Sequence, residues 1–183
     1  SWFFEDGSLI QTANARDAIA VLDTPGSSLW SNYTIRAKLF SEDDDAMGVI
    51  FGYRDAANYY RVVIVNQPVS FPFKQGTYLQ HVSNGIATTL GSSPAFYQPG
   101  TAIDLKVEFN YFEGIFVTLD GSPIIAADLA RPAFFRGTAG VYANWQEGLE
   151  VQEFSVHAAP VFPYFTIEAE ALEFFSPNEF LVP

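Results

Sequence analysis

The sequence predicts an all-β protein folded as a two-sheet antiparallel jelly-roll sandwich. Three observations predict this class. Strand-like stretches recur about every ten residues, Asn-Gly and Asp-Gly pairs separate several of them, and no stretch keeps a helical period. About a dozen strands of this length suit a jelly roll better than a seven-stranded immunoglobulin fold.

A central hairpin is the most strongly marked element. Residues 47–53 and 59–65 are two short runs of β-branched and aromatic residues, joined by a polar turn. Such continuous apolar runs are typical of strands buried on both faces. Simple alternation places Val49, Phe51 and Tyr53 on one face of the first strand.

Two further strands alternate cleanly between apolar and polar residues. Tyr33–Phe40 and residues 102–110 each predict a half-buried strand, with charged side chains such as Arg36 and Lys106 pointing outward. The remaining strands are expected at residues 8–13, 18–23, 77–82, 86–90, 114–119, 122–127, 137–144 and 149–157.

The strand pattern sets the expected domain boundary. We expect residues 1–157 to form the sandwich domain. Residues 158–183 are rich in Pro and Phe and are interpreted as an arm, a linker or the start of a neighbouring domain. Because residue 1 is Ser, we expect the chain to be a fragment or processed form of a larger multidomain protein.

Composition excludes several function classes. The 183 residues include no Cys, which excludes disulfides, zinc–thiolate sites and a thiol nucleophile. The net charge of −12, from 9 basic and 21 acidic residues, disfavours nucleic acid and anionic membranes as partners. No apolar run approaches the roughly 18 residues that a membrane-spanning helix needs, so no membrane insertion is expected.

An acidic segment precedes the central hairpin and suggests a calcium site. It carries Glu42, Asp43, Asp44 and Asp45. Ca²⁺ takes 6–8 oxygen ligands, and a bound cation relieves the repulsion between adjacent carboxylates. Two or three of these carboxylates plus backbone oxygens would be a realistic set. The alternative is a solvated acidic loop without an ion.

Carboxylates from elsewhere in the chain could complete the ligand set of the same ion. The first and last strands of such sandwiches often neighbour each other, so carboxylates near both ends of the domain are candidates. They are Glu5, Asp6 and Glu153.

Aromatic residues make up 16% of the chain and suggest a sugar-binding face. Sugars stack on Tyr and Trp rings and hydrogen-bond to polar side chains. The candidate ligand-binding residues are Tyr53, Tyr59, Arg61, Tyr78, His81, Tyr142, Asn144 and Trp145. Trp145, with Asn144 and Gln146 beside it near a strand end, is the favoured group. The alternative for each residue is ordinary packing.

Catalytic arrangements are weakly supported. A glycosidase needs two carboxylates about 5–10 Å apart. The nearest alternating pair is Glu168 and Glu170 in the tail, with Glu173 out of register. Glu150 and Glu153 are three residues apart and are expected on opposite faces of one strand. The two histidines, His81 and His157, are far apart in sequence and indicate no catalytic triad.

The order of motifs resembles the concanavalin A-like (laminin-G-like) jelly-roll superfamily. The motifs are WFFEDG at 2–7, WSNY at 30–33, DDDAMGVIFGYRDAANYYRV at 43–62, LQHVSNG at 79–85, VTLDG at 117–121, GTAGVYAN at 137–144 and VQEFSV at 151–156. The acidic segment is similar to the C-terminal lectin-like domain of thrombospondins, and the layout to bacterial fructan-binding modules. The similarity to the thrombospondin domain does not extend beyond about Val65 of this chain.

This resemblance implies a concanavalin A-like fold over residues 1–157 and calcium at the acidic segment. We expect a non-catalytic, extracellular or secreted module at the cell surface, which binds a carbohydrate or cell-surface glycan with a structural Ca²⁺. Two alternatives stay open. One is a glycan-acting hydrolase or its accessory domain, and the other is a structural spacer of an adhesin.

Overall fold

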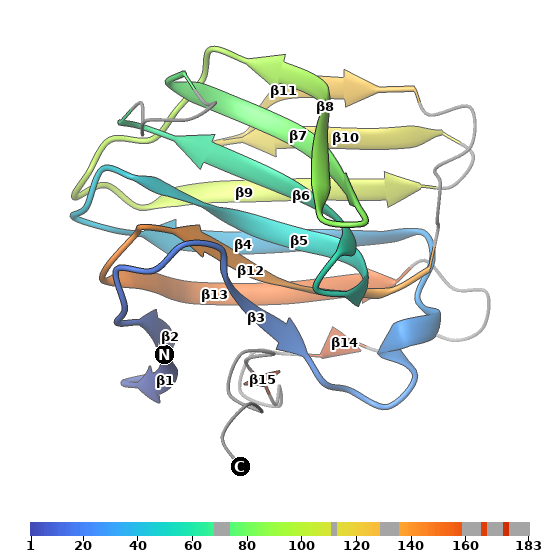
Figure 1. The fold of residues 1–183 in the computed structure, drawn as a ribbon, viewed down its shortest axis with the longest axis horizontal. Helices are drawn as coiled ribbons and strands as arrows, with labels where there is room; N and C mark the ends of the chain where they lie inside the picture. The colour runs from blue at the N-terminus through green and yellow to red at the C-terminus, as the bar shows by residue number, and fades with distance from the viewer. Residues whose placement is uncertain (68–73, 111–112, 129–135, 159–165, 168–173, 176–183) are drawn as a thin grey trace.

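The protein is a sandwich of two antiparallel sheets stacked face to face (Figure 1). The computed structural model describes residues 1–67, 74–110, 113–128, 136–158, 166–167 and 174–175. The predicted all-β jelly-roll class is confirmed. Among the described residues, no helix has the length and apolar character needed to span a bilayer.

One layer is an eight-stranded sheet. Its strands, in spatial order, are β1 (Trp2–Glu5), β2 (Ser8–Gln11), β13 (Leu149–Ala158), β4 (Tyr33–Phe40), β9 (Ile103–Asn110), β10 (Gly114–Leu119) and β11 (Ser122–Ala127). The short strand β14 (Thr166–Ile167) also pairs with β13. The sequence did not predict a strand at β1.

The other layer is a seven-stranded sheet, in front in Figure 1. Its strands, in spatial order, are β15 (Phe174–Phe175), β3 (Ala18–Leu22), β12 (Thr138–Asn144), β5 (Ala46–Asp55), β6 (Asn58–Val65), β7 (Gly76–Ser83) and β8 (Ile86–Ser93). A single 3₁₀ turn, η1 (Ser27–Leu29), connects β3 to β4.

The described parts of the tail each pair with a different sheet, β14 with β13 and β15 with β3. Most of residues 159–183 lies outside the described residues, including the candidate carboxylates Glu168, Glu170 and Glu173. The boundary at residue 157 therefore stays a prediction.

The main core lies between the sheets and follows the predicted alternation. Tyr60, Val62 and Ile64 of β6 point into it, opposite residues such as Val107 of β9. The other face of β6 is also buried, because Tyr59, Val63 and Val65 belong to a second apolar cluster on the outer side of the seven-stranded sheet. Because β6 is a central strand buried on both faces, its residues from Tyr59 to Val65 are apolar or aromatic with the single exception of Arg61.

A β-bulge corrects the predicted facing of Tyr53. Val49 and Phe51 point into the main core, but Tyr53 belongs to the outer cluster with Tyr59. The register of β5 shifts after Phe51, where Gly52 adopts a φ of 54°. The extra residue of a bulge reverses the facing of everything beyond it, and Gly adopts this backbone conformation without steric cost.

A second bulge corrects the predicted separation of Glu150 and Glu153. Glu150 lies opposite Phe40, and Glu153 lies opposite Lys38, with a register shift between Val151 and Glu153. The two glutamates therefore share the outward face of β13, although simple alternation predicted opposite faces.

Candidate functional site

Three consecutive carboxylates gather at one end of the sandwich, in the loop between β4 and β5. Carboxylate oxygens of Asp43, Asp44 and Asp45 lie within 4.8 Å of one another, and all three residues are half-buried. We call this group the acidic rim. Oxygens bound to one Ca²⁺ at 2.3–2.6 Å are separated by no more than about 5 Å, so these carboxylates fit such an ion.

The backbone of the acidic rim is held by the protein itself. The Tyr97 hydroxyl lies 2.9 Å from the carbonyl oxygen of Asp43 and shares its one proton between that oxygen and Gln146 Oε1. The Asn66 N–H donates to the carbonyl of Asp45 at 3.1 Å. The Asp44 carbonyl accepts the N–H of Gln67. A carbonyl oxygen that accepts one hydrogen bond keeps a second lone pair, so these backbone oxygens stay available to a cation beside the carboxylates.

The acidic rim is electrostatically unfavourable when all its members are ionised. Partial burial raises the pKa of Asp45, and the negative charges of Asp43 and Asp44 raise it further. Both causes penalise the charged carboxylate. A divalent cation would remove both penalties.

The other predicted ligands are not members of the three-carboxylate cluster. Glu42 is exposed and lines the same groove as Asp43, but is not among the three clustered carboxylates. Asp6 lies in the β1–β2 turn and is not among them either. Glu5 ends β1, and Glu153 lies on β13 with its carboxylate 3.9 Å from the Lys38 Nζ.

The turn between β12 and β13 lies against the acidic rim. The Glu147 N–H donates to Oδ2 of Asp43 at 2.9 Å. Gln146 is fully buried, and its Nε2 donates to Ser41 Oγ at 2.8 Å while its Oε1 accepts the Tyr97 hydroxyl at 2.8 Å. These contacts join the turn to the loop over more than one hundred residues of sequence.

Trp145 projects from this turn. It is 40% exposed and has a φ of 60°, an uncommon conformation for a bulky side chain. Its predicted partners hold the turn: Asn144 Oδ1 accepts the Asp17 N–H at 3.1 Å, and Gln146 is buried below. The neighbouring amides therefore support the backbone on both sides of an exposed indole ring.

A groove of about 700 Å³ lies beside this turn. It is lined by Asn14, Phe40, Glu42, Asp43, Glu147, Gly148 and Glu150. Its lining is strongly acidic, with carboxylates contributed by both the β4–β5 loop and the β12–β13 turn. Such a groove favours cations and hydroxyl-rich ligands and disfavours anions.

A separate polar group lies on the outer side of the seven-stranded sheet, centred on Arg61. Arg61 is 6% exposed and donates to Gln80 Oε1 (2.8 Å), the Tyr142 hydroxyl (2.7 Å) and Asp17 Oδ1 (3.1 Å). Its guanidinium carbon lies 4.7 Å from the centre of the Tyr142 ring. We call Asp17, Arg61, Gln80 and Tyr142 the Arg61 cluster.

The Arg61 cluster offers little surface to a ligand. The Tyr142 ring is 1% exposed, and burial raises the pKa of its hydroxyl well above its usual value. The Asp17 side chain is 50% exposed, so solvent reaches the ion pair from that side. A buried arginine satisfied on several sides is typical of a structural network.

The remaining predicted sugar-binding residues are scattered. Tyr53 and Tyr59 are buried against each other, with ring centres 6.0 Å apart. The half-buried Tyr78 donates its hydroxyl to the Lys74 carbonyl at 2.9 Å. His81 lies on the core-facing side of β7, stacked on Tyr60 at 4.7 Å, and burial lowers its pKa. Of the eight candidates, Trp145 is the one that combines exposure with proximity to the acidic rim.

Sequence reasoning missed Asp17, Gln80 and Tyr97 at these sites. Asp17 lies just before β3 and Tyr97 lies between β8 and β9, both far in sequence from their partners. No local pattern marks such residues, because their roles arise only when distant loops meet.

Comparisons with known proteins support the fold. No known family profile and no curated protein matches the sequence. Among solved structures, the carbohydrate-binding module CBM66 from Bacillus subtilis is 17% identical with a TM-score of 0.58, covering 84% of this chain and 87% of that chain.

Two other structures are similar. Toad ovary galectin, in complex with thio-digalactose, is 10% identical with a TM-score of 0.57, covering 78% of this chain and 99% of its own. A Parabacteroides distasonis protein, whose name proposes a glycosyl hydrolase, is 12% identical with a TM-score of 0.60, covering 86% and 90%. The chain therefore has the concanavalin A-like, galectin-type jelly-roll fold.

Proposed function

We propose that this chain is a non-catalytic, extracellular carbohydrate-binding module, and that Ca²⁺ bound at the acidic rim holds its binding loop in place. The sugar would lie against Trp145, with its hydroxyl groups directed toward the acidic groove. The main supporting observation is the exposed Trp145 ring in a turn whose next residues bond to the Asp43 loop.

The chemistry of Trp145 suits this function. An exposed indole ring offers a flat apolar surface for the C–H face of a sugar. The adjacent carboxylates and Asn14 provide acceptors for its hydroxyl groups. A strained backbone held by buried hydrogen bonds is a feature often found at binding sites. The structural similarity to a carbohydrate-binding module and a galectin is consistent with this proposal.

Calcium would act on the loop rather than on the sugar alone. It would neutralise Asp43, Asp44 and Asp45 together, and Asp43 also accepts the Glu147 N–H beside Trp145. A cation that fixes the Asp43 carboxylate would therefore also restrict the turn that carries the ring.

The hydrolase alternative has less support. Glu150 and Glu153 share the outward face of β13, but they line two different grooves. A retaining or inverting pair must instead face one bound sugar.

A glycan array probed with the fluorescently labelled chain tests the proposal, once in 2 mM CaCl₂ and once in EDTA. We expect a defined set of sugars to bind in calcium, and the signal to fall at least ten-fold in EDTA and in Trp145→Ala. An empty array would refute sugar binding and favour the spacer alternative. A signal unaffected by EDTA would refute the role of calcium.

A further inference from the structure

The outer face of the eight-stranded sheet places two cations directly opposite each other. Arg36 of β4 is the cross-strand partner of Lys106 of β9. Side chains in such a pair lie about 5 Å apart at Cβ, and like charges there are destabilising. The chain has 9 basic residues against 21 acidic ones, so pairing two of the nine is not a consequence of composition.

Hydroxyl groups flank the two cations on either side. Ser155 of β13 lies opposite Arg36, and Thr118 of β10 lies opposite Lys106. One row across four strands therefore reads Ser155, Arg36, Lys106 and Thr118, all pointing outward. Each of these four side chains can donate a hydrogen bond, and the two central side chains, Arg36 and Lys106, are positively charged.

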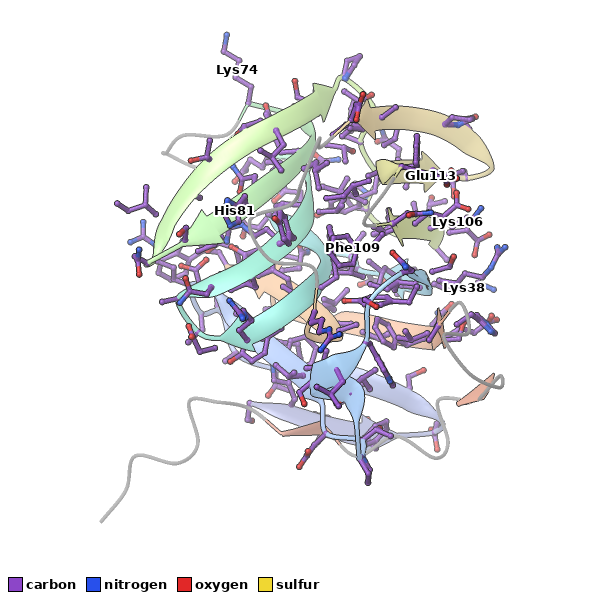
Figure 2. All side chains as sticks on the ribbon, turned by 90° about the vertical axis from the view of Figure 1, so that its right-hand side faces the viewer. Lys38, Lys74, His81, Lys106, Phe109 and Glu113 are labelled. Atoms are coloured by element: carbon purple, nitrogen blue, oxygen red, sulfur yellow. The ribbon has the colours of Figure 1, made fainter. Side chains whose placement is uncertain are left out.

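The row lies in a groove of about 800 Å³ on this face. Arg36 is exposed and makes no side-chain hydrogen bond or ion pair with any residue that the structure describes. Lys106 contacts the Glu108 carboxylate at 2.8 Å on the same strand. Figure 2 shows Lys38 and Lys106 on the side of the molecule away from the seven-stranded sheet.

Carboxylates occupy the neighbouring rows. Lys38 lies between Glu153 and Asp104 on one side, and Glu108 lies opposite Thr34 on the other. These carboxylates would repel a continuous polyanion, but they can accept hydrogen bonds from hydroxyl groups. The groove thus suits a ligand with a single anionic group on a hydroxyl-rich ring.

We infer that this groove binds an acidic sugar, with its carboxylate or sulfate held by Arg36 and Lys106 and its hydroxyl groups by the flanking residues. The site is separate from the Trp145 turn and does not depend on the function proposed there. Among the described residues that line the groove there is no exposed aromatic ring, so charge and hydrogen bonds would supply the affinity.

Titration followed by backbone amide NMR tests the inference, using galacturonic acid, galactose 6-sulfate, galactose and inorganic sulfate as probes. We expect one or both acidic sugars to shift the Arg36 and Lys106 amide signals, with binding at least ten-fold tighter than for galactose or sulfate. The response of the two acidic sugars identifies the carboxylate or the sulfate as the preferred group. Inorganic sulfate binding as tightly would indicate an adventitious ion only and overturn the inference, as would equal binding of galactose.

Matched variants localise the effect. Arg36→Gln and Lys106→Gln should each weaken acidic-sugar binding at least ten-fold, whereas Lys74→Gln, which makes the same charge change at an exposed residue just before β7, should not. Arg36→Glu should abolish binding and raise the melting temperature, because it places opposite charges across β4 and β9. Binding retained in both Gln variants would overturn the inference. Trp145→Ala should leave acidic-sugar binding at this groove unchanged, which separates this site from the one proposed at the Trp145 turn.

Discussion

The Oδ2 atom of Asp43 lies 2.9 Å from the backbone nitrogen of Glu147 and accepts its hydrogen bond. This bond connects the acidic rim to the turn that exposes Trp145. The buried Gln146 supports the same junction by bonding to Ser41 and Tyr97. A change in the charge of the acidic rim is therefore expected to reach the Trp145 ring through two residues of backbone.

Calcium should stabilise the protein through the acidic rim. A ligand at one hundred times its dissociation constant adds about 2.7 kcal/mol to the free energy of unfolding. For a chain of this size that corresponds to a rise of roughly 5–10 °C in melting temperature. Calorimetry in CaCl₂ and in EDTA measures this difference in melting temperature. Asp45→Asn should remove most of the rise, and Glu42→Gln, which changes an exposed carboxylate outside the cluster, should retain it. Identical melting temperatures in CaCl₂ and EDTA would contradict the prediction.

Without calcium, stability should depend on pH through Asp45. Its pKa in the folded state is raised above the usual 3.8, first by burial and then by Asp43 and Asp44. A raised folded-state pKa favours folding below pH 3.8, and this contribution is lost as the pH rises through the folded-state pKa. In EDTA, Asp45→Asn should therefore gain stability relative to the wild type between about pH 4 and pH 7. Urea unfolding at several pH values measures the difference, and a constant difference would argue against it.

Replacing Trp145 should separate binding from stability. Both Trp145→Ala and Trp145→Gly should lose sugar binding, because neither offers a ring. The φ of 60° is strained for Ala but not for Gly. We therefore expect the Gly variant to be more stable than the Ala variant by about 1 kcal/mol. Urea unfolding of the two variants measures this, and an Ala variant as stable as the Gly variant would show that the turn relaxes on substitution.

The Arg61 cluster should contribute to stability rather than to sugar binding. Arg61→Ala leaves Gln80 and the Tyr142 hydroxyl without their shared donor and removes the cationic partner of Asp17, which keeps the hydrogen bond from Tyr142. Breaking a buried pair costs 3–5 kcal/mol, and since Asp17 is half-exposed we expect a loss of about 3 kcal/mol. Chemical unfolding measures the loss, with Lys74→Ala, at an exposed cation just before β7, as the control. The folded Arg61→Ala variant should bind sugars on the glycan array as the wild type does. A loss of sugar binding with little loss of stability would instead place a ligand on the outer face of the seven-stranded sheet.

Much of the fold was determined by the sequence itself. The period-2 alternation of Tyr33–Phe40 predicts a strand buried on one face, and the apolar run of β6, interrupted only by Arg61, predicts one buried on both faces. Local residue order is sufficient for both predictions. The Asn-Gly and Asp-Gly pairs mark the β7–β8 and β10–β11 turns for the same local reason.

Tertiary structure alone decided the two bulges and the composition of the sites. An inserted residue at Gly52 or Gln152 reverses strand facing without any strong local signal, so Tyr53, Glu150 and Glu153 were misplaced. The pairing of Arg36 with Lys106, and of Asp43 with Glu147, depends on register between strands or loops that are distant in sequence. Local order fixes which way most side chains face, whereas only the packed sheets determine which of them meet.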